Sequence, residues 1–209
     1  MKWIWNGSAY CWLAGLVLAS GTKRGGFSMY EDLMETKIAS EDVFDGVLLH
    51  VRKDTVKLPN GRTATREWIR HPGASSVIPV LPDGSIILVR QYRYPIDQVT
   101  LEVPAGKLDS PEEDPLVCAE RELSEETGYT ADKIEKLTTI ATTVGFSNER
   151  IHLYVARGLT PGKQHTDEDE FINVVKVPLA EALAMIQDGR IIDAKSVVSI
   201  LMVSQQLKG

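Results

Sequence analysis

The sequence is poor in cysteine and has no run of basic residues. Only Cys11 and Cys118 occur among 209 residues, and they lie far apart in unrelated contexts. This excludes a disulfide framework and a cysteine-based metal site, and it is compatible with a reducing, cytoplasmic location. The formal net charge is −6. Without a basic tail that would release counterions, the chain is not expected to bind nucleic acid or an anionic membrane surface.

Long hydrophobic runs are also missing. The apolar stretch at residues 8–20 is too short to span a membrane. One interpretation is a signal-peptide core, although Lys23 and Arg24 follow it and no clear small-residue cleavage site does. The other is that residues 1–28 are non-native or disordered and that the physiological chain begins at Met29. The Lys-Arg-Gly-Gly sequence just upstream of Met29 is what a translated ribosome-binding site would encode.

What the sequence does contain is a series of β-strand patterns. Residues 43–70 read as strand, turn and strand around Asn60-Gly61, because both of these residues tolerate positive φ. A second hairpin is predicted from two Val- and Ile-rich runs, 75–81 and 85–93, which a Pro-Asp-Gly turn joins. Further strands are expected at 99–106, 133–144, 150–159 and 171–179.

Three helices complete the pattern. Asp114 and Pro115 suit the N-cap and first position of a helix that Gly128 would end. Two more helices are predicted near 180–187 and 193–207, the last with Asp193 as its cap. We therefore expect an α+β fold, a mixed α/β/α sandwich. An antiparallel strand region at 29–72, suited to dimerisation, would precede the main domain at 73–209.

Eight acidic side chains crowd into residues 106–129. At about 100° per helical residue, Glu122 and Glu126 project together beside an apolar stripe. Like charges one turn apart repel. Arg121 can pair with Glu125, which would leave Glu122 and Glu126 the least neutralised. The ordinary interpretation is a solvated helix face, but a hard divalent cation such as Mg²⁺ would also relieve the repulsion.

This stretch resembles the signature of the Nudix hydrolases, Gly-x5-Glu-x7-Arg-Glu-U-x-Glu-Glu-x-Gly-U, in which U is apolar. One residue more than the signature allows separates the first glycine from the first glutamate, and we place it in the loop at 107–111. Glu112 would restore the first spacing but break the second. The matching residues are Gly106, Glu113, Arg121, Glu122, Glu125, Glu126 and Gly128, with Leu123 and Tyr129 at the apolar positions.

The segments EVPAGKLD, RQYRYP and DEDEFINVVKVPL are similar to the ADP-ribose pyrophosphatase branch of that family. The resemblance implies a Mg²⁺-dependent enzyme, with Mn²⁺ as a possible substitute, that is usually a homodimer. It would hydrolyse a nucleoside diphosphate sugar, giving AMP and ribose 5-phosphate from ADP-ribose. The carbonyl of Ala105 and the carboxylates of Glu122 and Glu126 would hold the metal. Glu125 would assist them, and Arg121 would fix the helix carboxylates.

A second acidic segment, HTDEDEF at 165–171, is either an exposed loop or part of the site. In this branch a glutamate of this loop acts as metal ligand or general base. Glu168 and Glu170 would share one side of an extended chain, so both are candidates and their roles are not separated.

Four residues are candidates for substrate contacts. Arg93 matches a phosphate-binding arginine of the family, and Glu102 would lean toward the metals. Arg66 and Glu67 would contact the nucleotide or the site of a dimer partner.

The residue at position 144 does not allow the preferred substrate to be assigned. Val144 stands where this branch commonly has a proline that is associated with ADP-ribose preference. A dinucleotide or another sugar nucleotide is therefore an alternative substrate. A further alternative is a sensor that binds ADP-ribose without cleaving it, which the complete glutamate set disfavours.

Overall fold

The computed structural model describes residues 30–168 and 170–206. The two interpretations of residues 1–28, and the proposed start at Met29, lie outside this range. Among the residues described, no helix is long and apolar enough to cross a membrane.

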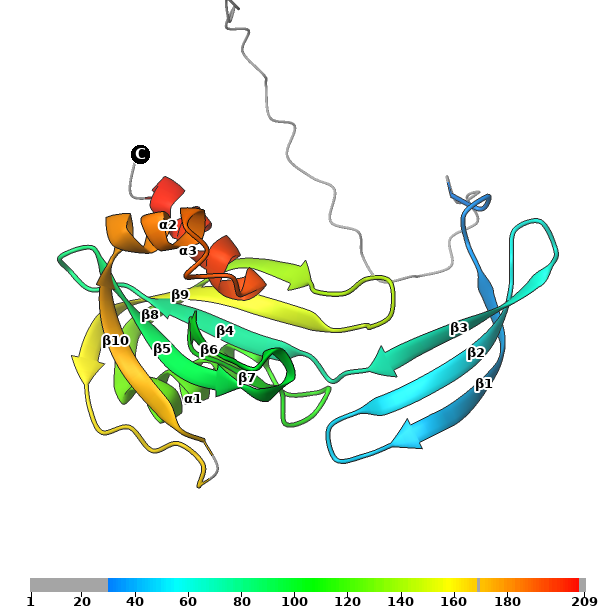
Figure 1. The fold of residues 1–209 in the computed structure, drawn as a ribbon, viewed down its shortest axis with the longest axis horizontal. Coiled ribbons are helices and arrows are strands. Elements are labelled where there is room, and N and C mark those ends of the chain that lie inside the picture. The colour runs from blue at the N-terminus through cyan, green and yellow to red at the C-terminus, as the bar shows by residue number, and fades with distance from the viewer. Residues whose placement is uncertain (1–29, 169, 207–209) are drawn as a thin grey trace, which may run out of the picture.

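The N-terminal strands form a sheet of their own that projects from the rest of the molecule (Figure 1). It has the order β1-β2-β3 and is antiparallel, with β1 at Thr36–Asp45, β2 at His50–Lys57 and β3 at Thr63–Arg70. The turn at Asn60-Gly61 is confirmed, and Gly61 has a φ of 84°. The prediction of one continuous strand before the Asn60-Gly61 turn is wrong, because a turn at 46–49 separates β1 from β2. Sequence patterning missed β1 because all its residues are exposed and it has no apolar face.

The remaining strands form two sheets, β7-β4-β9-β8 and β10-β5-β6. In the first sheet β4 runs parallel to β9, and the other pairs are antiparallel, so the sheet is mixed. The strands are β4 (Ala74–Pro79), β5 (Ser85–Arg93), β6 (Gln98–Glu102), β7 (Ala105–Lys107), β8 (Tyr129–Ala141), β9 (Arg150–Pro161) and β10 (Ile172–Pro178), with a short 3-10 helix η1 (Tyr94–Ile96) after β5.

The second hairpin predicted from the sequence is wrong in its strand pairing. The turn forms, since Leu81 N donates to Ser85 O at 2.8 Å, but β4 and β5 share only the isolated bridge between Val80 and Ile86. They then enter different sheets. A turn sequence specifies that the chain reverses, but it does not specify the pairing partners, which here are β7 and β9 for β4 and β6 and β10 for β5.

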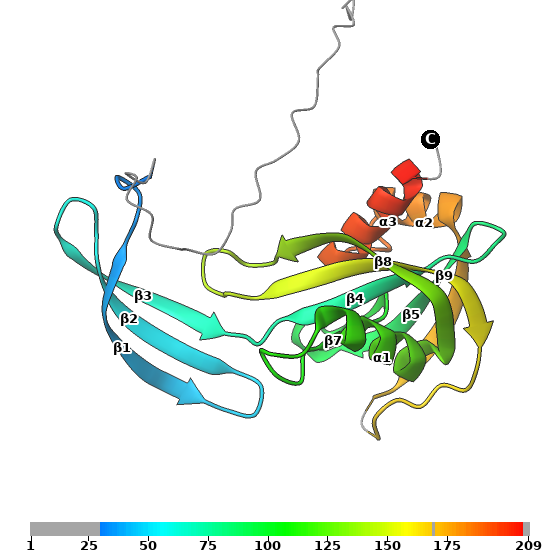
Figure 2. The same ribbon diagram turned by 180° about the vertical axis from the view of Figure 1, so that it is seen from behind.

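Helices cover the sheets from both sides, as the predicted sandwich requires. Helix α1 (Pro115–Thr127) lies on one side, and α2 (Leu179–Gln187) and α3 (Ala194–Gln206) lie on the other (Figures 1 and 2). The caps of α1 are confirmed: Asp114 accepts a hydrogen bond from Leu116 N, and Gly128 has a φ of 74°. Asp193 accepts a hydrogen bond from Ser196 N at 3.0 Å and caps α3. The α+β class is thus confirmed.

The apolar stripe of α1 faces the core as predicted. Ala119 and Leu123 are buried against Val77 of β4 and Tyr154 of β9, with Leu116 packed beside them. This packing fixes the rotation of the helix about its axis. The adjacent glutamates therefore point toward β7 and the loop that follows it.

Candidate active site

The site begins where β7 passes close to α1. Gly106 packs against the carboxylate of Glu122: a Cβ atom at Gly106 would lie 1.8 Å from Glu122 Oε1. One residue earlier, Ala105 N donates a hydrogen bond of 3.1 Å to Glu126 Oε2. Both glutamates are thereby held against the backbone of β7. Only glycine leaves room for the first of these contacts.

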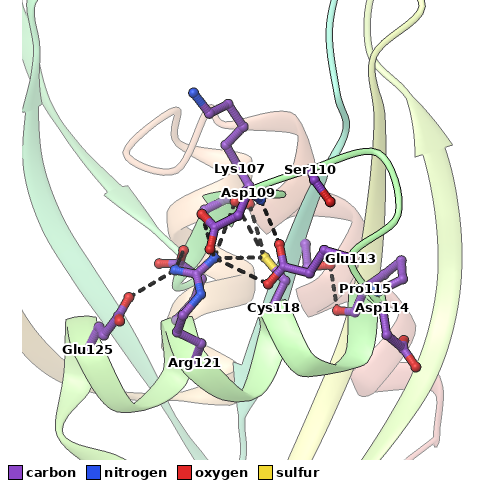
Figure 3. Close-up of polar contacts among 12 residues, drawn as sticks. Lys107, Asp109, Ser110, Glu113, Asp114, Pro115, Cys118, Arg121 and Glu125 are labelled. Carbon is purple, nitrogen blue, oxygen red and sulfur yellow. Dashed lines mark hydrogen bonds and ion pairs between the residues drawn. The ribbon is translucent and has the colours of Figure 1, made fainter.

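Arg121 binds several of the acidic residues and the loop at once. Its Nη1 lies 2.6 Å from Glu122 Oε1. Nη1 also lies 3.0 Å from Glu125 Oε2, and Nη2 donates to the carbonyl oxygen of Lys107 at 3.3 Å (Figure 3). The predicted pair with Glu125 is present. The inference that Glu122 is among the least neutralised carboxylates is wrong, because Arg121 contacts it more closely than Glu125. Within residues 30–168 and 170–206, Glu126 forms no ion pair.

Glu113 closes the loop between β7 and α1. Its Oε2 accepts a hydrogen bond from Asp109 N at 2.6 Å, and its Oε1 lies 3.8 Å from Arg121 Nη2. Figure 3 shows both contacts on the loop side of the guanidinium. Glu112 is exposed. The extra residue of the motif is thus accommodated in the loop, and Glu113 takes the position beside Arg121.

The two glutamates next to β7 are buried, which changes their acidity. Only 7% of Glu122 and 3% of Glu126 is exposed. Burial raises the pKa of Glu122 to about 7, against the charge of Arg121. Burial and the charge of Glu122 raise the pKa of Glu126 to about 8. Near neutral pH Glu126 is therefore largely protonated and Glu122 about half protonated, and binding of a divalent cation would release these protons.

The donors at this point suit a hard cation. Carboxylate and carbonyl oxygens are the ligands that Mg²⁺ takes, and it commonly keeps several waters. In the described part of the chain, no three His, Cys, Asp or Glu side chains gather into a ready-made metal cluster. Glu122 and Glu126 can thus supply part of a coordination shell, which a backbone carbonyl, water or substrate would complete.

The acidic loop after β9 is bound to the C-terminal end of α1. His165 N donates to Glu125 O at 3.0 Å, and Gln164 Nε2 donates to the carbonyls of Glu126 at 2.8 Å and of Ile172 at 3.3 Å. No sequence pattern had pointed to Gln164, because a single glutamine in a loop carries no motif. These contacts set the path of the loop past the buried glutamates.

The loop brings one of its two candidate glutamates near the site. Glu170 is half-buried, and its charge contributes to the raised pKa of both Glu122 and Glu126. Glu168 is exposed. The two candidates, equivalent in the sequence, thus lie in different environments.

Arg93 and Glu102 form a bidentate pair in the second sheet. Arg93 Nε and Nη2 donate to the two carboxylate oxygens of Glu102 at 2.8 and 2.7 Å. Lys195, which sequence reasoning did not single out, contacts the same carboxylate. Burial alone would raise the pKa of Glu102, but Arg93 and Lys195 hold it at about 2.

The remaining substrate candidates lie on the N-terminal sheet. Arg66 pairs with Glu35, and Glu67 is exposed. Strand β3, which carries Arg66 and Glu67, lies apart from α1 (Figure 1). The structure does not bring these two residues to the buried glutamates of the same chain.

Comparison with known proteins agrees with the fold and identifies the family. Residues 70–198 match the NUDIX domain, and residues 35–69 match the nucleoside diphosphate sugar hydrolase N-terminal domain. The chain is 44% identical to the methanol dehydrogenase activator of Bacillus methanolicus, over 83% of this chain and 96% of that protein. It is 42% identical to an ADP-ribose pyrophosphatase of Bacillus subtilis, over 81% of this chain and 92% of that protein.

Two further similarities bear on the substrate class and the fold. A GDP-mannose pyrophosphatase of Yersinia enterocolitica is 40% identical, over 62% of this chain and 71% of that protein. The crystal structure of an ADP compounds hydrolase superposes with a TM-score of 0.75 at 27% identity, covering 85% of this chain and 96% of that one. The chain is therefore a member of the Nudix hydrolase family.

Proposed function

We propose that this enzyme hydrolyses the diphosphate bond of ADP-ribose or a related nucleoside diphosphate sugar, giving AMP and ribose 5-phosphate from ADP-ribose. Mg²⁺ would be the cofactor and Mn²⁺ a substitute. The observation that carries this proposal is the buried pair Glu122 and Glu126, held against β7 with raised pKa values. Ionising two neighbouring buried carboxylates is costly, and a bound cation would offset that cost.

The residues around this pair would divide the chemistry. The carbonyl of Ala105 and the carboxylates of Glu122, Glu126 and Glu170 would hold the metal. When bound, Mg²⁺ neutralises diphosphate oxygens and lowers the pKa of a bound water.

Arg121 would keep Glu122 and Glu125 in place, and Glu125 would orient its neighbours. A glutamate of the 165–171 loop would take the proton of the attacking water. The half-buried position of Glu170 supports it over Glu168 for this step.

Substrate contacts would come from both domains. Arg93 would bind the diphosphate, with Glu102 orienting its guanidinium through the bidentate pair. Arg66 and Glu67 would contact the nucleotide from a partner subunit, since β3 lies apart from α1 in one chain (Figure 1).

We further propose that the enzyme is a cytoplasmic homodimer formed through the N-terminal strand region, residues 29–72. Every residue of β1 is exposed, Phe44 to 57% and Ile38 to 57%. A three-stranded sheet with so little buried surface is marginal alone, and a second copy would cover it. Light scattering should give the mass of two chains, and Phe44→Asp should give monomers. A wild-type monomer would contradict this.

The test of the reaction is a substrate panel with Mg²⁺ and with Mn²⁺. ADP-ribose, GDP-mannose, other sugar nucleotides and dinucleotides are compared by kcat/KM. ADP-ribose should rank first and give AMP and ribose 5-phosphate. A higher rank for GDP-mannose would support the second candidate, to which the GDP-mannose pyrophosphatase relatives point. Binding of ADP-ribose without turnover would indicate a sensor.

The role of the glutamates is tested with matched variants of α1. Glu122→Gln and Glu126→Gln should each lower kcat by about 100-fold or more, because each removes a charged ligand. Glu120→Gln is the control, since Glu120 lies on the same helix and is exposed. Near-normal activity of either buried variant would remove the central assignment.

A second candidate function follows from the similarity to a methanol dehydrogenase activator. Such an activity would require the chain to raise the turnover of a dehydrogenase added in the same assay. Wild-type protein and Glu122→Gln can be compared directly in that assay. Activation by the wild type alone would link it to the same site.

A further inference from the structure

A cluster of buried charges lies behind Arg93, between β6 and helix α3. The carboxylate of Glu102 is the centre of this cluster, and 4% of its side chain is exposed. Two cations contact it and differ in accessibility: 41% of the Arg93 side chain is exposed, against 9% for Lys195. Arg93 is therefore the more accessible of the two cations.

The hydrogen bonds to Glu102 follow a regular scheme. Oε1 accepts from Arg93 Nε at 2.8 Å and from the Thr100 hydroxyl at 2.5 Å. Oε2 accepts from Arg93 Nη2 at 2.7 Å and from Lys195 Nζ. Each carboxylate oxygen thus has one donor from Arg93 and one donor from a buried residue. If Arg93 turns away, each oxygen keeps one partner.

Lys195 is itself fixed in position. Its Nζ lies 3.1 Å from Asp193 Oδ2, and Asp193 also accepts a 2.5 Å hydrogen bond from the Ser196 hydroxyl. Ser196 Oγ in turn accepts from Val103 N at 2.8 Å. The start of α3 is thereby bound to the segment between β6 and β7. The contact of Lys195 with Glu102 therefore does not depend on Arg93.

There is room for Arg93 to take another partner. A cavity of about 350 Å³ lies beside its guanidinium, lined by Ile96, Thr100, Glu102, Ile192 and Lys195 among others. Because a buried charged group left without partners is costly, Arg93 could leave Glu102 for an incoming anion only if other donors remain on the carboxylate. Thr100 and Lys195 are those donors.

We propose that Lys195 is a positioning residue for substrate binding: together with Thr100 it holds Glu102, so that Arg93 can exchange the carboxylate for the diphosphate of the substrate. The inference rests on the proposed role of Arg93 as a diphosphate ligand. Lys195 does not touch the substrate. Its effect passes through Glu102 and Arg93, and it belongs to binding and not to the chemical step.

The experiment compares Lys195→Met, Lys195→Arg and Thr100→Val with the wild type. Lys195→Met and Thr100→Val should each weaken binding of ADP-ribose, measured by calorimetry without metal, by about tenfold. With Mg²⁺ the KM should rise similarly while kcat changes less than about twofold. Lys195→Arg should restore most of the affinity. The control is Lys176→Met, which removes an exposed ion pair with Asp83.

A double-mutant cycle with Glu102→Gln separates this role from simple stabilisation. In the Glu102→Gln background there is no carboxylate to satisfy, so adding Lys195→Met should change the affinity by less than about twofold. Additive effects of the two changes would overturn the inference. Unchanged affinity in both Lys195→Met and Thr100→Val would do the same, and Thr100→Val covers the case in which Lys195→Met does not fold.

The outcome is distinguishable from that of the proposed function. ADP-ribose that binds the wild type without being hydrolysed would refute the reaction and leave the binding cycle valid. Normal hydrolysis with affinity insensitive to Lys195 and Thr100 would refute only this inference. Failure of the wild type to bind ADP-ribose or any other nucleotide of the panel would refute both.

Discussion

Replacing Glu126 by glutamine should lower kcat by about 100-fold or more and yet stabilise the metal-free protein at alkaline pH. The pKa of Glu126 is raised from 4.5 to about 8, first by burial and then by the charge of Glu122. Between these two pH values the unfolded chain loses the proton while the folded chain keeps it. The stability of the wild type therefore falls as pH rises from 4.5 to about 8 and is level above that.

The magnitude follows from the same two values. A tenfold change in proton affinity is equivalent to about 1.4 kcal/mol, so a rise from 4.5 to about 8 sets an upper limit of about 5 kcal/mol. Relaxation and water penetration reduce the penalty for a buried charge, and we expect about 2 kcal/mol. Glutamine keeps an oxygen that can accept the hydrogen bond from Ala105 N, and its side chain has no charge that burial would destabilise.

The assay is urea unfolding, followed by circular dichroism in the presence of a chelator, at about pH 5 and about pH 8.5. Glu126→Gln should match the wild type at the lower pH and exceed it by about 2 kcal/mol at the higher. Saturating Mg²⁺ should stabilise the wild type at the higher pH and not the variant. Glu120→Gln, which changes an exposed residue of the same helix, should have no effect. A variant less stable than the wild type at about pH 8.5 would refute the reasoning.

Three further predictions concern the geometry of the site. Gly106→Ala should lower kcat by about 100-fold, because the new Cβ would lie 1.8 Å from Glu122 Oε1 and displace the carboxylate; activity within twofold of the wild type would contradict this. Gln164→Leu should reduce the unfolding free energy by about 1 kcal/mol and lower kcat, because it removes one of the two hydrogen bonds that hold the loop to α1; a change in stability without a change in kcat would show that this contact does not affect the reaction. Glu170→Gln should lower kcat by about 100-fold or more, as expected for loss of a general base, while Glu168→Gln should keep kcat within a few-fold of the wild type; the reverse order would assign the base to Glu168.

Local signals predicted the loop and helix of the site well. The caps Asp114 and Gly128 and the apolar stripe of α1 depend on residues within a few positions of each other, and the structure has them as expected. The contact of Glu113 with Arg121 was not predicted, although Glu113 was kept as the signature match and the extra residue was placed in the loop at 107–111.

What the sequence could not supply depends on contacts between distant segments. Strand β4 pairs with β9, 77 positions further on, and β5 pairs with β10, 81 to 93 positions further on, which a turn motif cannot reveal. Lys195 meets Glu102 across 93 positions, and a lysine on an amphipathic helix ordinarily faces solvent. Arg121 was assigned to Glu125 by helical spacing, but its guanidinium also reaches its sequence neighbour Glu122.

Hydrogen bonds, as well as the polypeptide chain, connect the two domains. The backbone of Ile69, at the end of β3, exchanges hydrogen bonds with Phe146 and Asn148 of the loop that carries Val144, and the Asn148 side chain binds the backbone of His71 on both its N–H and its carbonyl. These hydrogen bonds fix the end of the N-terminal sheet to this loop. If the N-terminal sheet forms the proposed dimer contact and the Val144 loop influences substrate choice, a foreign N-terminal sheet should change nucleotide preference, and an exchange of the loop should change dimer formation.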